Sequence, residues 1–146
     1  MSIDRGPWPH IPYNVDLVVR FINGINKRNL DALASLMTED HTFVDSLGHE
    51  LRGREAVLEG WRGYFSMMPE YEVEDDEMIG GPDSIAIFGI ASGTYAPDGK
   101  KSPDRRWSTP AAWKAEIRGD QVAVWRVYAD NKPVYDLMRS EPSEGE

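Results

Sequence analysis

Hydrophobic residues in the first half of the chain recur at helical spacing. Apolar positions three or four residues apart predict helices over residues 14–28, 30–37 and 54–65. Asn14 has a side chain that can cap the first of these helices. Between the second and third helices, residues 41–46 (HTFVDS) alternate in polarity, which predicts a short strand followed by a turn.

The second half of the chain changes to a period of two, which is typical of strands in a half-buried sheet. Four strands are expected, over residues 71–79, 84–96, 105–117 and 121–129. Residues 118–120 (Arg-Gly-Asp) predict a tight hairpin between the last two strands. Gly89 and Gly93 lie inside a strand, where glycine marks a bend or a bulge. A final helical turn is expected over residues 133–139.

Helices that precede a run of antiparallel strands indicate an α+β domain. One face of an antiparallel sheet has to be covered, and the three N-terminal helices can cover it. A strongly curved, mostly antiparallel sheet then encloses a cavity between its concave face and the helices. We expect one such domain over residues 14–139, with an extended proline-rich arm before it (residues 1–13) and a flexible acidic tail after it (residues 140–146).

The composition of the chain excludes some classes of binding partner and some kinds of chemistry. The 146 residues suit a single domain and include no cysteine, which excludes disulfides and thiolate chemistry. The net charge of −9, from 25 acidic and 16 basic residues, argues against a nucleic-acid partner, because phosphate binding needs a basic surface. The apolar runs and the N-terminal sequence match neither a membrane span nor a signal peptide, so we expect a cytoplasmic protein. No metal-ligand spacing such as His-x-His is present, and neither a metal nor a cofactor is expected.

Two segments of the chain resemble a known superfamily. The run FINGINKRNLDALASLMTEDHTFVDSLGHELRGREAVLEGW (residues 21–61) is similar to the front half of SnoaL-like and ketosteroid-isomerase-like proteins, which belong to the nuclear-transport-factor-2-like superfamily. The run AAWKAEIRGDQVAVWRVYAD (residues 111–130) resembles their closing hairpin. The resemblance extends over residues 14–138 and implies a cone-shaped α+β barrel around a pocket. It leaves the reaction open, because this fold hosts isomerases, cyclases, dehydratases, hydrolases and binding modules.

The resemblance implies a role for Asp45 but not a complete ketosteroid-isomerase site. Asp45 matches the general base of those isomerases. Their oxyanion hole uses a tyrosine and a protonated aspartate. The matching positions hold Phe21 and, to within a small register shift, Ala112, and residues 107–115 contain no carboxylate. The electrophile of the isomerases is therefore missing from those positions.

The epoxide-hydrolase and dehydratase branches match no better. The hydrolases use an arginine, two aspartates, a tyrosine and an asparagine around a water. The tyrosine, the asparagine and one aspartate correspond here to Phe43, Asp45 and Val127, and the middle strand offers neither an arginine nor an aspartate. The dehydratase pattern needs pocket histidines, for which His41 is the candidate.

Strand alternation places His41, Phe43 and Asp45 on one face of a strand. If Phe43 faces the pocket, Asp45 lies on the pocket wall, where a carboxylate suits a general base for a proton next to a carbonyl. Asp45 and His41 are therefore the catalytic candidates. In the competing interpretations, Asp45 caps the turn over residues 46–49 and His41 lies near solvent at the strand start. Alternation turns Asp130 away from the pocket.

Large apolar side chains on the expected inner faces could line a pocket for a flat or cyclic apolar molecule, or could fill that space as core. The expected lining is Phe21, Phe43, Trp61, Tyr64, Phe65, Trp113, Trp125 and Val127. One hypothesis is a cofactor-independent acid–base enzyme (an isomerase, cyclase or lyase) that acts on an apolar cyclic carbonyl compound, with Asp45 as the proton shuttle. The alternative is a non-catalytic ligand-binding or dimeric accessory module.

The outer face of the expected sheet carries a mixture of charged and aromatic residues. Lys114, Glu116, Arg126 and Tyr128 alternate onto this face. Members of the superfamily commonly dimerise through it, so the resemblance implies a homodimer.

Overall fold

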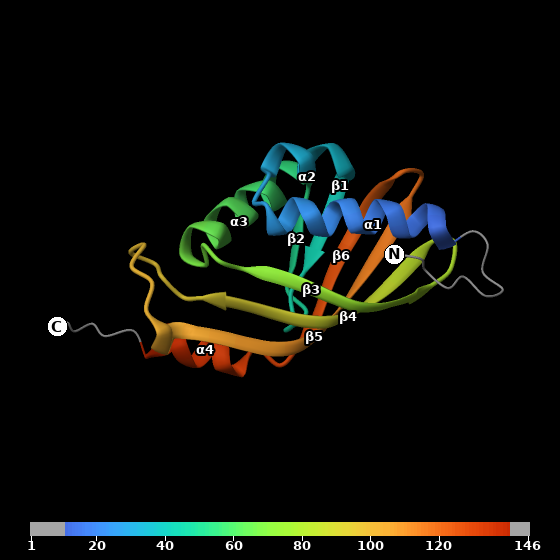
Figure 1. Cartoon of the computed structure of the whole chain (residues 1–146). Coiled ribbons are helices and arrows are strands. Elements are labelled where there is room, and N and C mark those ends of the chain that lie inside the picture. Colours follow the sequence, from blue (N-terminus) through green and yellow to red (C-terminus); the bar gives the residue numbers. More distant parts are fainter. Residues whose placement is uncertain (1–10, 141–146) are drawn as a thin grey trace.

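The computed structural model describes residues 11–140, which form helices packed on one curved sheet (Figure 1). The helices are α1 (Ile11–Asn26), α2 (Leu30–Leu36), α3 (Arg54–Met67), the 3-10 helix η1 (Pro103–Arg105) and α4 (Lys132–Arg139). The strands are β1 (Met37–Val44), β2 (Glu50–Arg52), β3 (Glu72–Gly80), β4 (Ser84–Thr94), β5 (Arg106–Arg118) and β6 (Gln121–Ala129). Among the described residues, no helix is long and apolar enough to cross a membrane.

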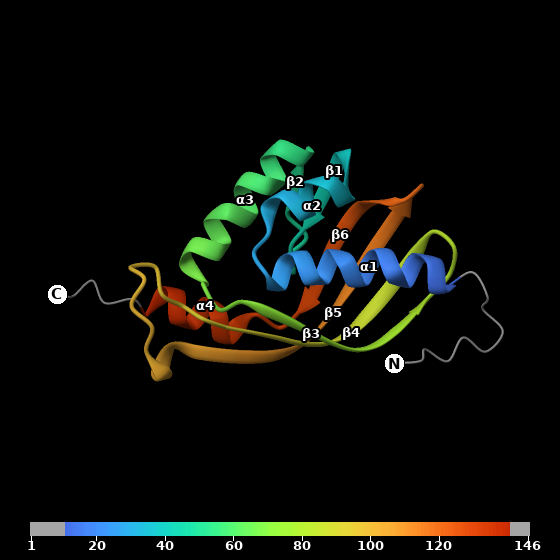
Figure 2. The same ribbon diagram turned by 45° about the horizontal axis from the view of Figure 1, so that its top comes forward.

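The six strands form a single sheet in the order β2-β1-β6-β5-β4-β3. Only β1 and β6 pair in parallel, and the other neighbours are antiparallel. The sheet bends strongly along its length, α1 and α3 lie across its concave side, and α4 lies near the C-terminal end of α3 (Figures 1 and 2). The expected α+β cone with a mostly antiparallel sheet is thus confirmed, with α4 as a fourth helix.

Helix α1 packs its apolar stripe into the core. Val18, Phe21 and Ile25 are fully buried, and burial of such a side chain contributes roughly 1.5–3 kcal/mol. Asn26 also ties the helix to the sheet, because its side-chain amide donates to the carbonyl of Val73 (3.0 Å) and accepts from the N–H of Val73 (2.8 Å). The amide therefore pairs with β3 as a neighbouring strand would.

The first helix begins earlier than the sequence pattern indicates. It starts at Ile11, so the expected cap Asn14 lies inside it, and residues 11–13 belong to the helix and not to an extended arm. The buried Asn14 side chain donates to the carbonyls of Pro82 (2.7 Å) and Gly81 (3.2 Å). Asn14 is thus a tertiary contact to the β3–β4 turn. The rest of the expected arm and nearly all of the expected tail lie outside the described residues.

The segment after β1 is a hairpin and not a turn alone. Residues Glu50–Arg52 form the edge strand β2 and pair antiparallel with residues 42–44 of β1. The strand has only three residues, all of them exposed, which is too short for its polar–apolar alternation to predict a strand. The pairing with β1 defines this strand, and Leu51 at its centre lines the cavity described below.

Gly89 lies opposite a bulge, as the sequence pattern predicts. The β3–β4 register shifts between Asp75 and Glu77, and Gly89 pairs with Asp75 at that point. A Cβ atom on Gly89 would lie 1.8 Å from the carbonyl oxygen of Glu74. Only glycine allows the two strands to approach this closely, and the bulge helps the sheet to bend.

Candidate functional site

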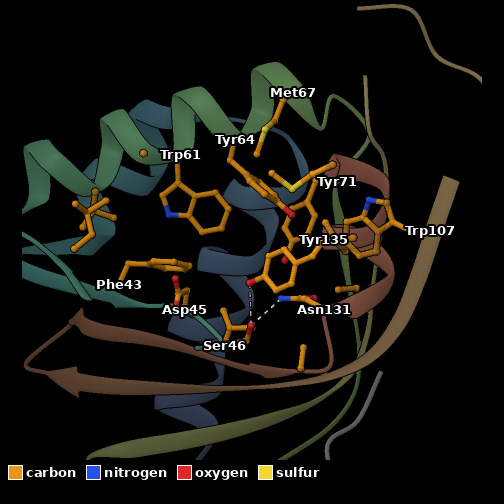
Figure 3. A pocket seen from close by; sticks show the side chains of 18 residues that line it. Phe43, Asp45, Ser46, Trp61, Tyr64, Met67, Tyr71, Trp107, Asn131 and Tyr135 are labelled. Atoms are coloured by element: carbon orange, nitrogen blue, oxygen red, sulfur yellow. Dashed lines mark hydrogen bonds between the residues drawn. The ribbon is translucent and has the colours of Figure 1, made fainter. Parts of the chain in front are cut away.

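One cavity of about 280 Å³ opens between α3, the β1–β2 turn, β6 and α4 (Figure 3). Its volume is near the lower end of the usual range for small-molecule sites. The lining residues are Phe43, Asp45, Ser46, Leu51, Val57, Gly60, Trp61, Tyr64, Met67, Tyr71, Ala91, Trp107, Val127, Ala129, Asn131, Val134, Tyr135 and Met138. Most of these side chains are apolar or aromatic.

Aromatic rings in mutual contact form a continuous wall of the cavity. Phe43 meets Trp61 edge to face, with ring centroids 5.7 Å apart, and Tyr64 meets Tyr71 in the same way at 5.1 Å. Trp107 continues the wall, with its ring centroid 6.1 Å from that of Tyr71. Burial raises the pKa of both Tyr64 and Tyr71 far above the usual range, so their phenols stay neutral.

Asp45 has two structural roles at once. It lines the cavity, and its Oδ1 accepts the backbone N–H groups of Leu47 and His49, both at 2.9 Å. Its Oδ2 lies 3.4 Å from Nδ1 of His49. The pocket-wall and turn-capping interpretations therefore both hold, and the turn fixes the carboxylate at the cavity. Among the described residues that line the cavity, Asp45 is the only charged side chain.

Three uncharged polar side chains accompany Asp45 at this end of the cavity. Asn131 Nδ2 donates to Ser46 Oγ at 3.0 Å, and the hydroxyl oxygens of Ser46 and Tyr135 are 3.5 Å apart. Ser46 follows β1, whereas Asn131 and Tyr135 come from the start of α4. In Figure 3 the Tyr135 hydroxyl points toward the side of the cavity that holds Ser46 and Asp45.

His41 lies in the core and does not line the cavity. It is fully buried, its Nδ1 lies 2.7 Å from the carbonyl oxygen of Val122, and its ring centroid is 5.9 Å from that of Phe21. Burial lowers the pKa of His41, so the ring stays neutral. The expectation that it lies near solvent is wrong, and the structure does not bring it together with Asp45.

Half of the residues expected to line the pocket border the cavity, and the other half belong to the core. Phe43, Trp61, Tyr64 and Val127 line the cavity. Phe21, Phe65, Trp113 and Trp125 do not, because they are packed inside the core. Phe21 of α1 packs on Trp125 of β6, with 4.8 Å between ring centroids. For this second group the filled-core interpretation is correct.

Sequence reasoning missed the contribution of α4 to the site. Val134, Tyr135 and Met138 occur at helical spacing, which is a signal for one apolar face on this helix. Nothing in that spacing indicates which part of the sheet the face covers. Ser46, Tyr71, Trp107 and Asn131 were also missed, because assignment to a turn or a strand does not show which residues border the cavity.

Within the described part of the chain, no group of three or more His, Asp or Glu side chains could hold a metal ion. The site consists of one carboxylate, three neutral polar side chains beside it, and an aromatic wall that includes the phenols of Tyr64 and Tyr71. This arrangement can hold a small, largely apolar molecule, offer hydrogen bonds to an oxygen atom, and exchange a proton with a carboxylate.

An α+β cone with a cavity between its sheet and its helices defines a protein of the nuclear-transport-factor-2-like class. The family model described as a SnoaL-like domain matches residues 18–135, and the chain belongs to this family. No protein with a curated description matches the chain by sequence.

Solved structures show the same fold at low sequence identity. A putative polyketide cyclase from Xanthomonas campestris pv. campestris is 14% identical over 88% of this chain and 98% of its own, with a TM-score of 0.77. TerC, co-crystallised with polyporic acid, is 15% identical over 88% and 99%, with a TM-score of 0.72. A protein of ketosteroid-isomerase-like fold from Catenulispora acidiphila DSM 44928, in complex with trimethylamine, is 21% identical over 77% and 84%, with a TM-score of 0.67.

Proposed function

We propose that this protein is a cofactor-independent acid–base enzyme, of the isomerase, cyclase or lyase type, that acts on an apolar cyclic carbonyl compound. The observation that carries the proposal is the lone carboxylate of Asp45 in a cavity whose other described lining residues are uncharged. Aromatic rings such as Trp61 and Phe43 would hold the ring system of the substrate. Structural neighbours bound to polyporic acid and to trimethylamine support a small molecule as the occupant of this fold.

In the proposed reaction Asp45 removes a proton from a carbon next to the substrate carbonyl. The C–H electron pair forms a carbon–carbon double bond, and the carbonyl electrons move to oxygen, which gives an enolate. The carboxylic acid of Asp45 then returns the proton to the same or another carbon. The backbone N–H groups of Leu47 and His49 hold the carboxylate in one position, which favours proton transfer in a fixed geometry.

The test uses NMR to measure how fast the protein exchanges carbon-bound protons of cyclic ketones for deuterium in heavy water. The substitution Asp45→Asn should lower the rate of carbon–hydrogen exchange by about 100-fold or more, because general base catalysis contributes on that order. Binding of the ketone should persist. Asp120→Asn, in the exposed β5–β6 turn, removes a carboxylate away from the cavity and should leave the rate unchanged. Exchange that is equally fast in the Asp45→Asn variant would refute Asp45 as the base.

The second candidate is a non-catalytic ligand-binding module. The engagement of Asp45 in its own turn favours it, because backbone donors already occupy Oδ1 and His49 lies beside Oδ2. Tight ketone binding without exchange in the unsubstituted protein would select this function.

We also propose a cytoplasmic homodimer that associates through the outer sheet face. On that face Phe88, Ala112 and Tyr128 lie side by side on β4, β5 and β6. Phe88 is 41% exposed and Tyr128 is 49% exposed, and a second copy would cover them. Lys114 and Glu116 form an ion pair at 3.6 Å beside them, which supplies a polar rim.

A further inference from the structure

The sites at which a ketosteroid isomerase carries its electrophile are apolar in this protein. Phe21 is fully buried and does not line the cavity, and Ala112 belongs to the outer face beside Phe88 and Tyr128. An enolate formed by Asp45 would need hydrogen-bond donors from elsewhere. The cluster of Ser46, Asn131 and Tyr135 lies at the same end of the cavity as Asp45.

The bond from Asn131 uses neither of the two hydroxyl protons in this cluster. An amide Nδ2 can only donate, so the bond from Asn131 uses a lone pair of Ser46 Oγ and leaves the Ser46 proton available. The separation of 3.5 Å between Ser46 Oγ and Tyr135 Oη is longer than a normal bond between hydroxyl groups. A ligand oxygen to one side of this pair, equally distant from both hydroxyls, could therefore accept from each of them at a shorter distance.

The position of the cluster relative to the base suits one carbonyl group. Ser46 directly follows Asp45 in the chain, and the Tyr135 hydroxyl faces the same end of the cavity (Figure 3). The proton-donating groups and the proton-accepting carboxylate thus border one small volume with apolar walls. Removal of water from such a volume strengthens hydrogen bonds to a developing negative charge.

We propose that Tyr135 is a catalytic residue that donates a hydrogen bond to the substrate carbonyl oxygen, with Ser46 as the second donor. Asn131 is a positioning residue, because it orients Ser46 through Oγ. As Asp45 removes the carbon-bound proton, the negative charge that forms on the carbonyl oxygen is stabilised by the two hydroxyls, which keep their own protons. The proposal rests on the proposed function, since it assigns the electrophile of that reaction.

A phenolate binding experiment tests the donors without a known substrate. The probe is 4-nitrophenol, whose anion is a flat ring with a charged oxygen and absorbs visible light, unlike the neutral form. The Asp45→Asn variant serves as the starting protein for the further substitutions. It lacks the negative charge that would repel the phenolate, and its neutral side chain represents the protonated Asp45 that forms when the substrate loses its proton. We expect this variant to bind 4-nitrophenolate more tightly than the unsubstituted protein does.

Adding Tyr135→Phe to this starting protein should weaken phenolate binding by roughly 10-fold, as expected for a hydrogen bond to a charged oxygen. The absorption maximum of the bound phenolate should also shift, because it reports the donors at the oxygen. Asn131→Ala should shift the maximum in the same direction to a smaller extent. Tyr128→Phe, which changes an exposed tyrosine on the outer face, is the matched control and should alter neither quantity.

Equal affinity and an equal absorption maximum with and without the Tyr135 hydroxyl would overturn the proposal, as would the absence of phenolate binding to Asp45→Asn. Tyr135→Phe keeps the ring, and an unchanged thermal unfolding midpoint would show that the fold is retained. If phenolate binding depends on Tyr135 while ketone exchange does not depend on Asp45, the donor site stands and the proposed base fails. The opposite pair of results would retain the base and remove the donor site.

Discussion

At the residue scale, the position of Asp45 follows from a local interaction and not from its neighbours in the cavity. Its Oδ1 closes the turn after β1 by accepting two backbone N–H groups. Such turns are typical of aspartate, because its short side chain reaches the backbone two residues ahead. The same carboxylate borders the cavity, so the turn aims a charged group that an apolar wall alone could not orient.

His41 differs from Asp45, because it is a titratable residue that is buried in the core in its neutral form. Its Nδ1 faces a carbonyl oxygen and must therefore carry the proton of the neutral ring. Its Nε2 is buried without a hydrogen-bond partner among the described residues. Protonation would place an unpaired N–H and a positive charge beside Phe21, which burial opposes.

We predict that His41 makes the protein less stable in acid. Burial lowers the pKa of His41 below its ordinary value of 6.5, so the unfolded chain binds this proton more readily than the folded chain. Its contribution to stability is complete above pH 6.5 and decreases as the pH falls through that value toward the lowered pKa. His41→Asn keeps a donor for the Val122 carbonyl and does not titrate.

The measurement is the free energy of unfolding in urea at several pH values between about 7 and 5. From the higher to the lower pH, the unsubstituted protein should lose more stability than the His41→Asn variant. Parallel losses in the two proteins would show that His41 does not contribute to the acid sensitivity.

At the element scale, the curvature of the sheet depends on the contact between β3 and β4. The bulge between Asp75 and Glu77 lets β3 approach β4 at Gly89, and the register continues on both sides of it. Helix α4 depends on a different long-range contact, because the hydroxyl and amide groups at its start meet Ser46 after β1.

Gly89→Ala should lower the free energy of unfolding by about 2 kcal/mol or more, because the new methyl group overlaps the carbonyl oxygen of Glu74. Gly63→Ala is the matched control: Gly63 lies in α3, and a Cβ atom there meets no neighbour within 4 Å. This control should stabilise the protein by up to about 1 kcal/mol, because alanine favours helices. Urea titrations compare the two variants, and equal stabilities would contradict the role given to Gly89.

At the scale of the whole molecule, the curved sheet has two faces with different uses. Its concave face carries the core and the cavity, under α1, α3 and α4. Its outer face leaves Phe88 and Tyr128 exposed on adjacent strands, beside charged residues. Exposed aromatic rings with charged residues beside them are the kind of surface that the proposed dimer would cover.

The proposed dimer predicts a mass in solution of twice that of one chain. Phe88→Glu would bury a carboxylate in the interface and should yield monomers, whereas Leu47→Glu, at an exposed leucine in the β1–β2 turn, should remain dimeric. Sedimentation equilibrium at several concentrations measures both. A monomeric mass for the unsubstituted protein would refute the dimer.

Most of the helices and strands, and the family, could be predicted from the sequence alone. Side-chain periodicity depends only on the geometry of a helix or a strand, so the apolar stripe of α1 and the alternation of β6 could be recognised without a tertiary model. The same alternation placed Phe43 and Asp45 on one face, and both line the cavity. The motifs of residues 21–61 led to the correct fold.

Which inner-facing side chains border the cavity could not be predicted from the sequence, because it depends on how remote segments pack together. Phe21 and Trp125 share the predicted inner surface with Phe43, yet their rings pack on each other between α1 and β6, because α1 covers that part of the sheet. Tyr135 meets Ser46, which lies 89 positions earlier in the chain, because the bend of the sheet brings α4 against the β1–β2 turn. Periodicity reports the direction of a side chain from its own backbone, whereas a cavity depends on the distance between backbones that are remote in sequence.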